Sequence, residues 1–167
     1  MLSYTSYKEV NLLANIGIIT CTNCTQDLDC ASMICLKDLR ERKGFFQRYP
    51  PEEPLELTGI INCAGCPTVS AEARILRRVR SIADFRVEAI HFSYCMIALC
   101  PFKGKYVRVI REAYPDVNLV MGTHTPREPR EFQKEVQEML CAGRLTMSDL
   151  IKGRLANKHL LRGKNNE

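Results

Sequence analysis

Four strand-like segments, each followed by a helix-like segment, run through the chain, and this alternation is the feature that most constrains its fold. The first segment, 16–20, is apolar on both faces, as expected of a central strand in a parallel sheet. Further strands are expected at 55–61, 88–93 and 117–122, and helices at 32–43, 70–83, 105–114 and 128–140. Such alternation predicts a parallel sheet that is covered by helices.

The predicted fold class is therefore α/β, with three layers. We expect a mostly parallel sheet of four to five strands with helices on both faces, similar to flavodoxin-like or Rossmann-like folds. The helix at 70–83 has the clearest pattern, because Ile75, Val79 and Ile82 fall on one face and arginines crowd the rest. Ser70 is expected to cap its N-terminus.

Length and composition predict one domain and a short tail. The chain has 167 residues, which suits a single cysteine-rich α/β metal-binding domain at 1–145 and a basic C-terminal tail at 146–167. No apolar run is long enough to span a bilayer, so no membrane association is expected. The first twenty residues lack the pattern of a signal peptide, and a cytoplasmic location is expected. The net charge of +5 is too small to indicate a dedicated nucleic-acid binder.

Nine cysteines are many for a cytoplasmic protein. Structural disulfides are rare in that compartment, so abundant cysteine indicates metal or redox chemistry. An odd number also excludes complete pairing within a monomer. Cys63 and Cys66 form a Cys-x-x-Cys turn, in which Gly65 can adopt a positive φ angle. Such a pair is typical either of half a metal site or of a redox dithiol.

The cysteines follow the predicted strands. Cys21, Cys63 and Cys95 each come shortly after a different strand, and His124 follows the fourth. Right-handed crossovers place the C-terminal ends of all parallel strands at one edge of the sheet, where ligands of open α/β sheets bind. The sequence therefore predicts one site at this edge, with His124 as a ligand or proton relay.

The cysteine spacing leaves the kind of site open. Thiolates are ligands of both zinc and iron–sulfur clusters, and the spacings match neither a zinc ribbon nor a ferredoxin. Cys24 is equally well interpreted as a ligand or as a bystander of Cys21. Cys141 is better interpreted as a core residue. Packing is also expected for His91 in its strand, and solvent exposure for the arginines of 74–80.

The assembled pieces resemble the CGGC-domain family of small metal-binding proteins. The resemblance covers about 15–124 and is carried by 16–21, 43–46, 59–67, 90–96 and 122–124, together with Cys30, Cys35 and Cys100-Pro101. The first glycine of the family's naming motif is Ala64 here. The resemblance implies metal binding through seven cysteines: Cys21, Cys30, Cys35, Cys63, Cys66, Cys95 and Cys100.

We therefore expect a protein that binds zinc or an iron–sulfur cluster at the C-terminal edge of a parallel sheet. Its role would lie in redox chemistry, sensing or metal handling, with a redox protein as a candidate partner. One alternative is a thiol–disulfide oxidoreductase that uses Cys63 and Cys66. Another is an interaction module with structural zinc, in which the basic tail meets nucleic acid. The tail disfavours nucleic acid as a partner, because it lacks the aromatic residues that stack on bases.

Overall fold

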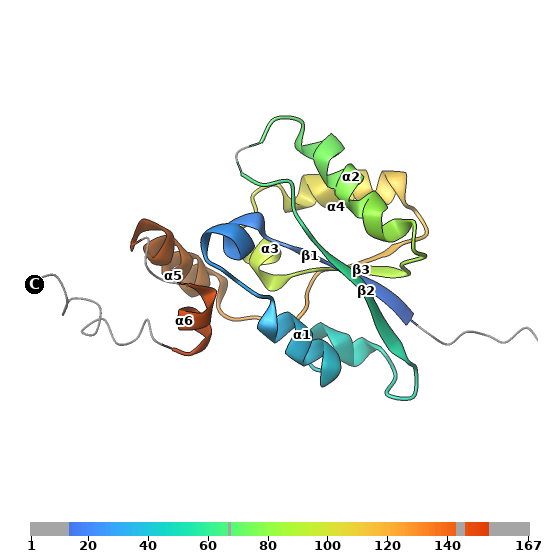
Figure 1. The fold of residues 1–167 in the computed structure, drawn as a ribbon, viewed down its shortest axis with the longest axis horizontal. Helices are drawn as coiled ribbons and strands as arrows, with labels where there is room; N and C mark the ends of the chain where they lie inside the picture. The colour runs from blue at the N-terminus through green and yellow to red at the C-terminus, as the bar shows by residue number, and fades with distance from the viewer. Residues whose placement is uncertain (1–13, 67, 143–145, 154–167) are drawn as a thin grey trace, which may run out of the picture.

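A computed structural model describes residues 14–66, 68–142 and 146–153 of the protein. In this part of the chain a single sheet has four parallel strands in the order β2-β1-β3-β4 (Figure 1). The order reverses between β1 and β3, as in doubly wound sheets. The predicted α/β fold with a parallel sheet is confirmed. The strands are β1 Ala14–Thr20, β2 Leu55–Asn62, β3 Ala89–Phe92 and β4 Asn118–Val120.

Helices cover both faces of the sheet, and this confirms the three layers. The helix α1, Met33–Arg40, and the short 3₁₀ helix η2, Gly44–Arg48, lie on one face (Figure 1). On the other face, α2, Ala71–Ala83, packs beside α4, Lys103–Ala113. Crossovers of one hand place these helices on opposite faces, because β2 and β3 lie on opposite sides of β1.

The strand β1 is buried on both faces because its side chains alternate between two cores. Ile16 and Ile18 belong to the cluster beneath α1 and η2, with Leu39 and Phe46. Ile19 belongs to the larger cluster beneath α2 and α4. This period of two agrees with the apolar run that predicted a central strand.

The apolar face of α2 is buried as predicted, and Ser70 occupies the predicted N-cap position without making a side-chain capping bond. Ile75, Val79 and Ile82 are all buried. Ser70 has a φ angle of 57° and makes no side-chain capping hydrogen bond. A capping serine normally has an extended backbone, which aims its hydroxyl at the free N–H groups of the first turn. The left-handed backbone of Ser70 is not that conformation.

Several short helices gather at the C-terminal edge of the sheet, around the ends of the strands (Figure 1). They are the π-helix η1, Asn23–Asp27, the helices α3, Tyr94–Leu99, and α6, Met147–Ile151, together with the longer α5, Pro129–Ala142. The α6 helix begins within the segment predicted as a tail. Its Met147 N–H donates to the Leu28 carbonyl at 2.8 Å. Residues 154–167 of that predicted tail lie outside the described residues.

His91 is buried within β3, as expected, and ties the sheet to η2. Its Nδ1 lies 2.7 Å from the Gly122 carbonyl oxygen, and its Nε2 lies 2.7 Å from the Tyr49 hydroxyl. The ring stacks on Phe46 with a centroid distance of 4.5 Å. Burial lowers the pKa of His91 to about 4, so the ring is neutral near pH 7. Among the described helices, none has the length and apolar character needed to cross a membrane.

Candidate metal centre

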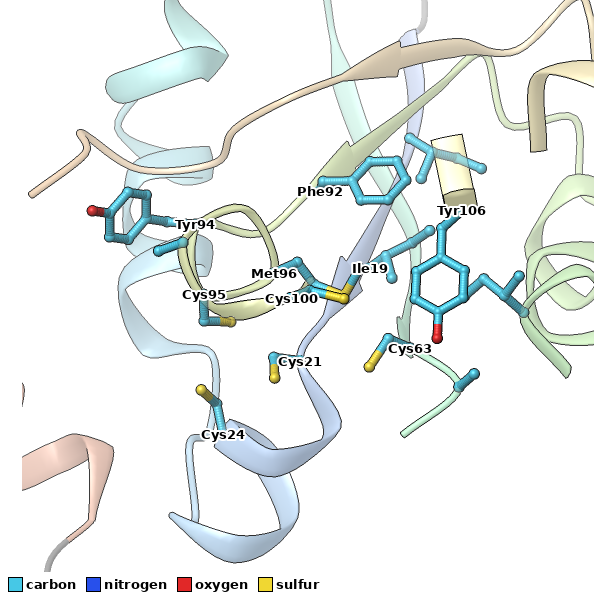
Figure 2. Close-up of a cluster of buried hydrophobic side chains, with 14 of the residues drawn as sticks. Ile19, Cys21, Cys24, Cys63, Phe92, Tyr94, Cys95, Met96, Cys100 and Tyr106 are labelled. Carbon is cyan, nitrogen blue, oxygen red and sulfur yellow. The ribbon is translucent and has the colours of Figure 1, made fainter. Parts of the chain in front are cut away.

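Four cysteine side chains come together at the C-terminal edge of the sheet (Figure 2). Cys21 directly follows β1, Cys24 lies one helical turn later in η1, Cys63 follows β2, and Cys95 lies at the start of α3, just after β3. Their exposed fractions are 7%, 0%, 2% and 9%. The strands β1 and β3 flank the point at which the strand order reverses, which is where open α/β sheets bind their ligands. We refer to these residues as the four-thiol cluster.

The four thiols interact in a chain that runs from Cys63 through Cys21 and Cys24 to Cys95. Hydrogen bonds from Cys24 and Cys63 hold the pKa of Cys21 well below its ordinary value. The hydrogen bond to Cys21 raises the pKa of Cys63. Hydrogen bonds to Cys21 and Cys95 raise the pKa of Cys24. The contact with Cys24 lowers the pKa of Cys95. Cys21 and Cys95 are therefore the sulfurs that the cluster favours as thiolates, and their neighbours act as donors.

Backbone and hydroxyl groups around the cluster also suit negatively charged sulfur. The Thr22 N–H donates to the Cys63 Sγ at 3.4 Å, and the Thr22 hydroxyl donates to the Cys63 carbonyl at 2.9 Å. The Ser93 Oγ lies 3.0 Å from the Cys95 Sγ. Backbone N–H groups of Asn23 and Cys24 further lower the pKa of Cys21. Thiolate ligands of metals are commonly stabilised by such donors, so the donor set fits a soft cation.

The sulfurs do not form a ready-made coordination shell. Within 14–66, 68–142 and 146–153, no group of three or more His, Cys, Asp or Glu side chains has the arrangement of a metal site. The four thiols point at one another as hydrogen-bonding partners. A metal would therefore replace the shared protons, and the sulfurs would have to turn from their neighbours toward a common centre.

The turn at 63–66 is held by its backbone and by α2. Gly65 has a φ angle of 90°, as expected for the glycine of this turn. Ala64 is not among the described residues with a positive φ angle, so alanine replaces the family's glycine without strain. Arg78 donates from its guanidinium to the carbonyl oxygens of Asn62, at 3.1 Å, and of Cys63. The expectation that the arginines of 74–80 are solvent-exposed without a partner is therefore wrong for Arg78.

Replacing Arg78 with alanine should expose Cys63. Two hydrogen bonds from a charged group would be lost from the turn, and each is worth about 1.5–3 kcal/mol. We expect iodoacetamide to alkylate Cys63 about tenfold faster in this variant. A decrease of about 1.4 kcal/mol in the free energy of local opening is enough for a tenfold change in rate. Mass spectrometry of the peptide that contains Cys63 measures the rate. Arg77→Ala on the exposed side of α2 is the control, and equal rates in the two variants would contradict this role of Arg78.

A first cavity, of about 230 Å³, adjoins the cluster on the side of Cys63. Cys21, Cys63, Cys66 and Cys100 all line it, and α5 closes it. Cys66 is exposed, whereas Cys100 is buried. We call this space the Cys66 cavity. Cys66 and Cys100 therefore lie near the cluster but outside its chain of hydrogen-bonded thiols.

A second cavity, of about 440 Å³, adjoins the cluster on the side of Cys95. Cys30, Cys35, Cys95 and His124 line one part of it, and apolar side chains of α5 and α6 line another. The Cys35 Sγ lies 3.4 Å from the Thr123 hydroxyl, and burial raises the pKa of Cys35 to about 12. Burial also raises the pKa of Cys30. These two thiols stay protonated near pH 7 in the absence of a ligand.

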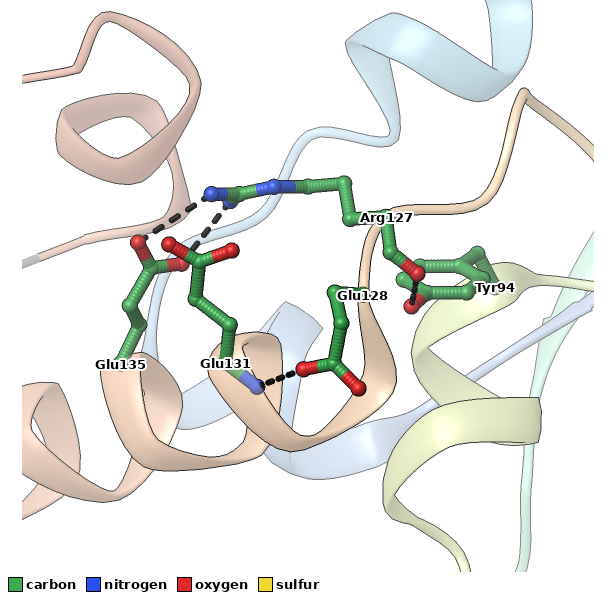
Figure 3. A network of polar contacts seen from close by, with 5 residues as sticks. All are labelled: Tyr94, Arg127, Glu128, Glu131 and Glu135. Atoms are coloured by element: carbon green, nitrogen blue, oxygen red, sulfur yellow. Dashed lines mark hydrogen bonds and ion pairs between the residues drawn. The ribbon is translucent and has the colours of Figure 1, made fainter.

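A polar network holds the segment between His124 and α5 beside the second cavity (Figure 3). The Tyr94 hydroxyl donates to the Arg127 carbonyl at 2.6 Å, which fastens this segment to α3. Arg127 pairs with Glu135 of α5 at 2.9 Å. Glu128 accepts the Glu131 N–H at 2.6 Å and so satisfies a free donor in the first turn of α5. The edge that carries the cysteines is thereby joined to the helix that covers it.

Each ligand predicted from the sequence lies in the cluster or on one of the two cavities. Cys21, Cys63 and Cys95 lie in the cluster itself, and the others line the cavities: Cys30, Cys35, Cys66, Cys100 and His124. The sequence left the role of Cys24 open, whereas the structure buries Cys24 completely between Cys21 and Cys95. Cys21 and Cys24 have the same Cys-x-x-Cys spacing as Cys63 and Cys66, but that spacing alone does not specify which sulfurs meet. Cys141 is exposed, so its interpretation as a core residue is wrong.

Comparisons with known proteins give one family and one distant relative. The sequence model of a family described as the CGGC domain matches residues 15–124, which include eight of the nine cysteines. An uncharacterized protein of Methanocaldococcus jannaschii is 28% identical over 118 residues, which cover 66% of this chain and 86% of that protein. No solved structure matches the chain.

Proposed function

Because the chain belongs to the CGGC-domain family, we propose that it is a metal-binding protein whose four-thiol cluster holds zinc or an iron–sulfur cluster. The observation that carries the proposal is the meeting of four sulfurs from the ends of three strands. The CGGC domain by itself suggests metal binding, and the cluster gives that suggestion a specific set of ligands.

To serve one ion, the four sulfurs would have to rotate from their hydrogen-bonding partners toward a common centre. In a tetrahedral site with zinc–sulfur distances of about 2.3 Å, neighbouring sulfurs lie about 3.8 Å apart, which is also a usual separation for hydrogen-bonded thiols. Cys21, the acceptor of two thiol hydrogen bonds, is best placed to bind the ion first. Cys24 and Cys63 would then lose their protons as they bind. Arg78 and Thr22 would hold the Cys63 turn in place meanwhile.

A bound metal would supply either structural cross-linking, as zinc does, or electron transfer, as an iron–sulfur cluster does. The proposal narrows the ligand set predicted from the sequence. Cys21, Cys63 and Cys95 stay in it, and Cys24 joins them. Cys30, Cys35, Cys66, Cys100 and His124 are assigned to the cavities beside the metal and not to its first coordination shell.

The two alternatives receive less support. A thiol–disulfide enzyme using Cys63 and Cys66 would need a reactive thiolate, yet the pKa of Cys63 is raised by its hydrogen bond to Cys21 and that of Cys66 by partial desolvation. A structural zinc module that binds nucleic acid depends on a tail of which most lies outside the described residues. We therefore retain metal binding as the function.

The experiment is a metal analysis of protein that is purified without oxygen. We expect bound zinc, or iron together with acid-labile sulfide, in a fixed ratio to the protein. Metal-free protein titrated with Co²⁺ should develop the strong sulfur-to-cobalt absorption and the visible bands of a tetrahedral thiolate site. Protein that holds no zinc or iron and gives no such bands with Co²⁺ would contradict the proposal.

A further inference from the structure

The Cys66 cavity is lined by one exposed thiol and three buried ones. Cys66 is exposed, whereas Cys100, Cys63 and Cys21 are 6%, 2% and 7% exposed, and all four line the same space. Cys21 and Cys63 are members of the four-thiol cluster, whereas Cys66 and Cys100 are not. The cavity therefore joins an exposed thiol to the buried cluster.

We propose that Cys66 and Cys100 form a transit site, through which a soft metal ion passes from the surface to the four-thiol cluster. The inference rests on the proposed function, because it assigns an entry route to that same cluster. It assigns to Cys66 and Cys100 a role in loading that differs from the role of a resident ligand.

The other residues of the cavity favour a soft ion. Its polar groups besides the thiols are the amides of Asn23, Gln133 and Gln137, and its apolar wall is formed by α3 and α5 residues such as Leu99 and Val136. Among the described residues that line the cavity, none carries a carboxylate or an imidazole. Hard cations such as Mg²⁺ and Ca²⁺ need several oxygen ligands, whereas zinc and copper(I) bind thiolates well. The thiols are thus the strongest ligands that an entering ion meets.

The passage is a series of ligand exchanges without electron transfer. At each step one metal–sulfur bond forms to the next cysteine, and one bond to the previous ligand breaks. The proton of the incoming thiol moves to the departing ligand or to water. Cys66 would take the ion from its donor, Cys100 would share it within the cavity, and Cys63 and Cys21 would receive it. The charge and the number of electrons of the metal stay the same throughout.

Loading kinetics test this assignment. Metal-free protein is mixed with Zn²⁺ held by a colorimetric chelator, and the release of the chelator is followed in a stopped-flow instrument. Cys66→Ser and Cys100→Ser should each slow transfer by about tenfold, a change within the usual range for association rates among variants of one site. The affinity and stoichiometry of zinc at equilibrium should stay within about twofold of the wild type, because the cluster is intact. Cys141→Ser removes the other exposed thiol and should change neither quantity.

The outcomes separate the transit site from the proposed function. Wild-type protein that takes no zinc from the chelator would contradict the transit site, and it would contradict the proposed function as well if the protein purified without oxygen also holds no iron. Normal uptake by the wild type, with an unchanged rate in Cys66→Ser, would contradict the transit site alone. A loss of zinc stoichiometry in Cys66→Ser would also overturn it, because Cys66 would then be a resident ligand. Since Cys66 is exposed, this variant tests the proposal even if Cys100→Ser folds poorly.

Discussion

Replacing Cys24 with serine is expected to weaken metal binding by about 100-fold. Structural zinc sites contribute about 10–16 kcal/mol, so the loss of one of four equivalent ligands removes about 3 kcal/mol. Cys24 is the most informative ligand to remove, because it is the one that the sequence pattern left undecided and the fold buries completely between Cys21 and Cys95. Competition of the variant and the wild type for Zn²⁺ against a chelator of known affinity measures the change.

Cys35→Ser is the matched control for Cys24→Ser. Cys35 is also buried, and its sulfur contacts Thr123 rather than another cysteine. We expect its replacement to leave zinc affinity nearly unchanged. Thermal unfolding of both metal-free variants shows whether either substitution damages the fold itself. Equal loss of affinity in the two variants would contradict the four-thiol assignment, and so would wild-type affinity in Cys24→Ser.

Acid is expected to destabilise the metal-free protein through His91. The folded pKa of His91 lies at about 4, below the value of 6.5 for a free imidazole. The neutral ring is therefore preferred in the fold, and its contribution is complete above pH 6.5 and is lost as the pH falls toward 4. A difference of this size corresponds to about 3 kcal/mol. Tyr49, whose pKa is raised to about 12, stays protonated and donates to the ring, while nearby Arg48 further disfavours a charged imidazole.

The measurement compares urea unfolding of metal-free wild type and His91→Gln between pH 7.5 and 4.5. The wild type should lose stability over this range, and the variant should be less stable at pH 7.5 but lose less on acidification. Metal-free protein is used because protonation of cysteine ligands would otherwise add its own pH dependence. Parallel loss of stability in the two proteins would show that His91 is not the responsible group.

The layers of the fold are predictable from the sequence because the periodicity of apolar residues in the longer elements determines which faces are buried. The run at 16–20 is buried on both faces of the sheet, and the stripe of α2 packs where its period of 3.6 residues places it. The elements that were missed, η1, η2, α3 and α6, are too short for a period to be recognised. Their positions depend on contacts distant in sequence, such as the bond between Met147 and Leu28.

The meeting of cysteines at one edge of the sheet was predictable, but the set of cysteines in the four-thiol cluster was not. Strand ends place Cys21, Cys63 and Cys95 at one edge, and this follows from topology alone. Whether Cys24 faces its neighbours or solvent depends on the π-helical turn of η1, which no spacing rule specifies. The hydrogen bond from Arg78 to the Cys63 turn could not be predicted from the sequence either. A charged helix face is expected to be solvated unless the segments packed against it are known.

X-ray absorption at the zinc edge of zinc-loaded protein is the most direct test of binding by the four-thiol cluster. Zinc held by the four-thiol cluster should have a first shell of four sulfur atoms at about 2.3 Å, and in Cys24→Ser a shell with one sulfur fewer. A first shell dominated by nitrogen or oxygen, or a four-sulfur shell that persists in Cys24→Ser, would contradict this assignment.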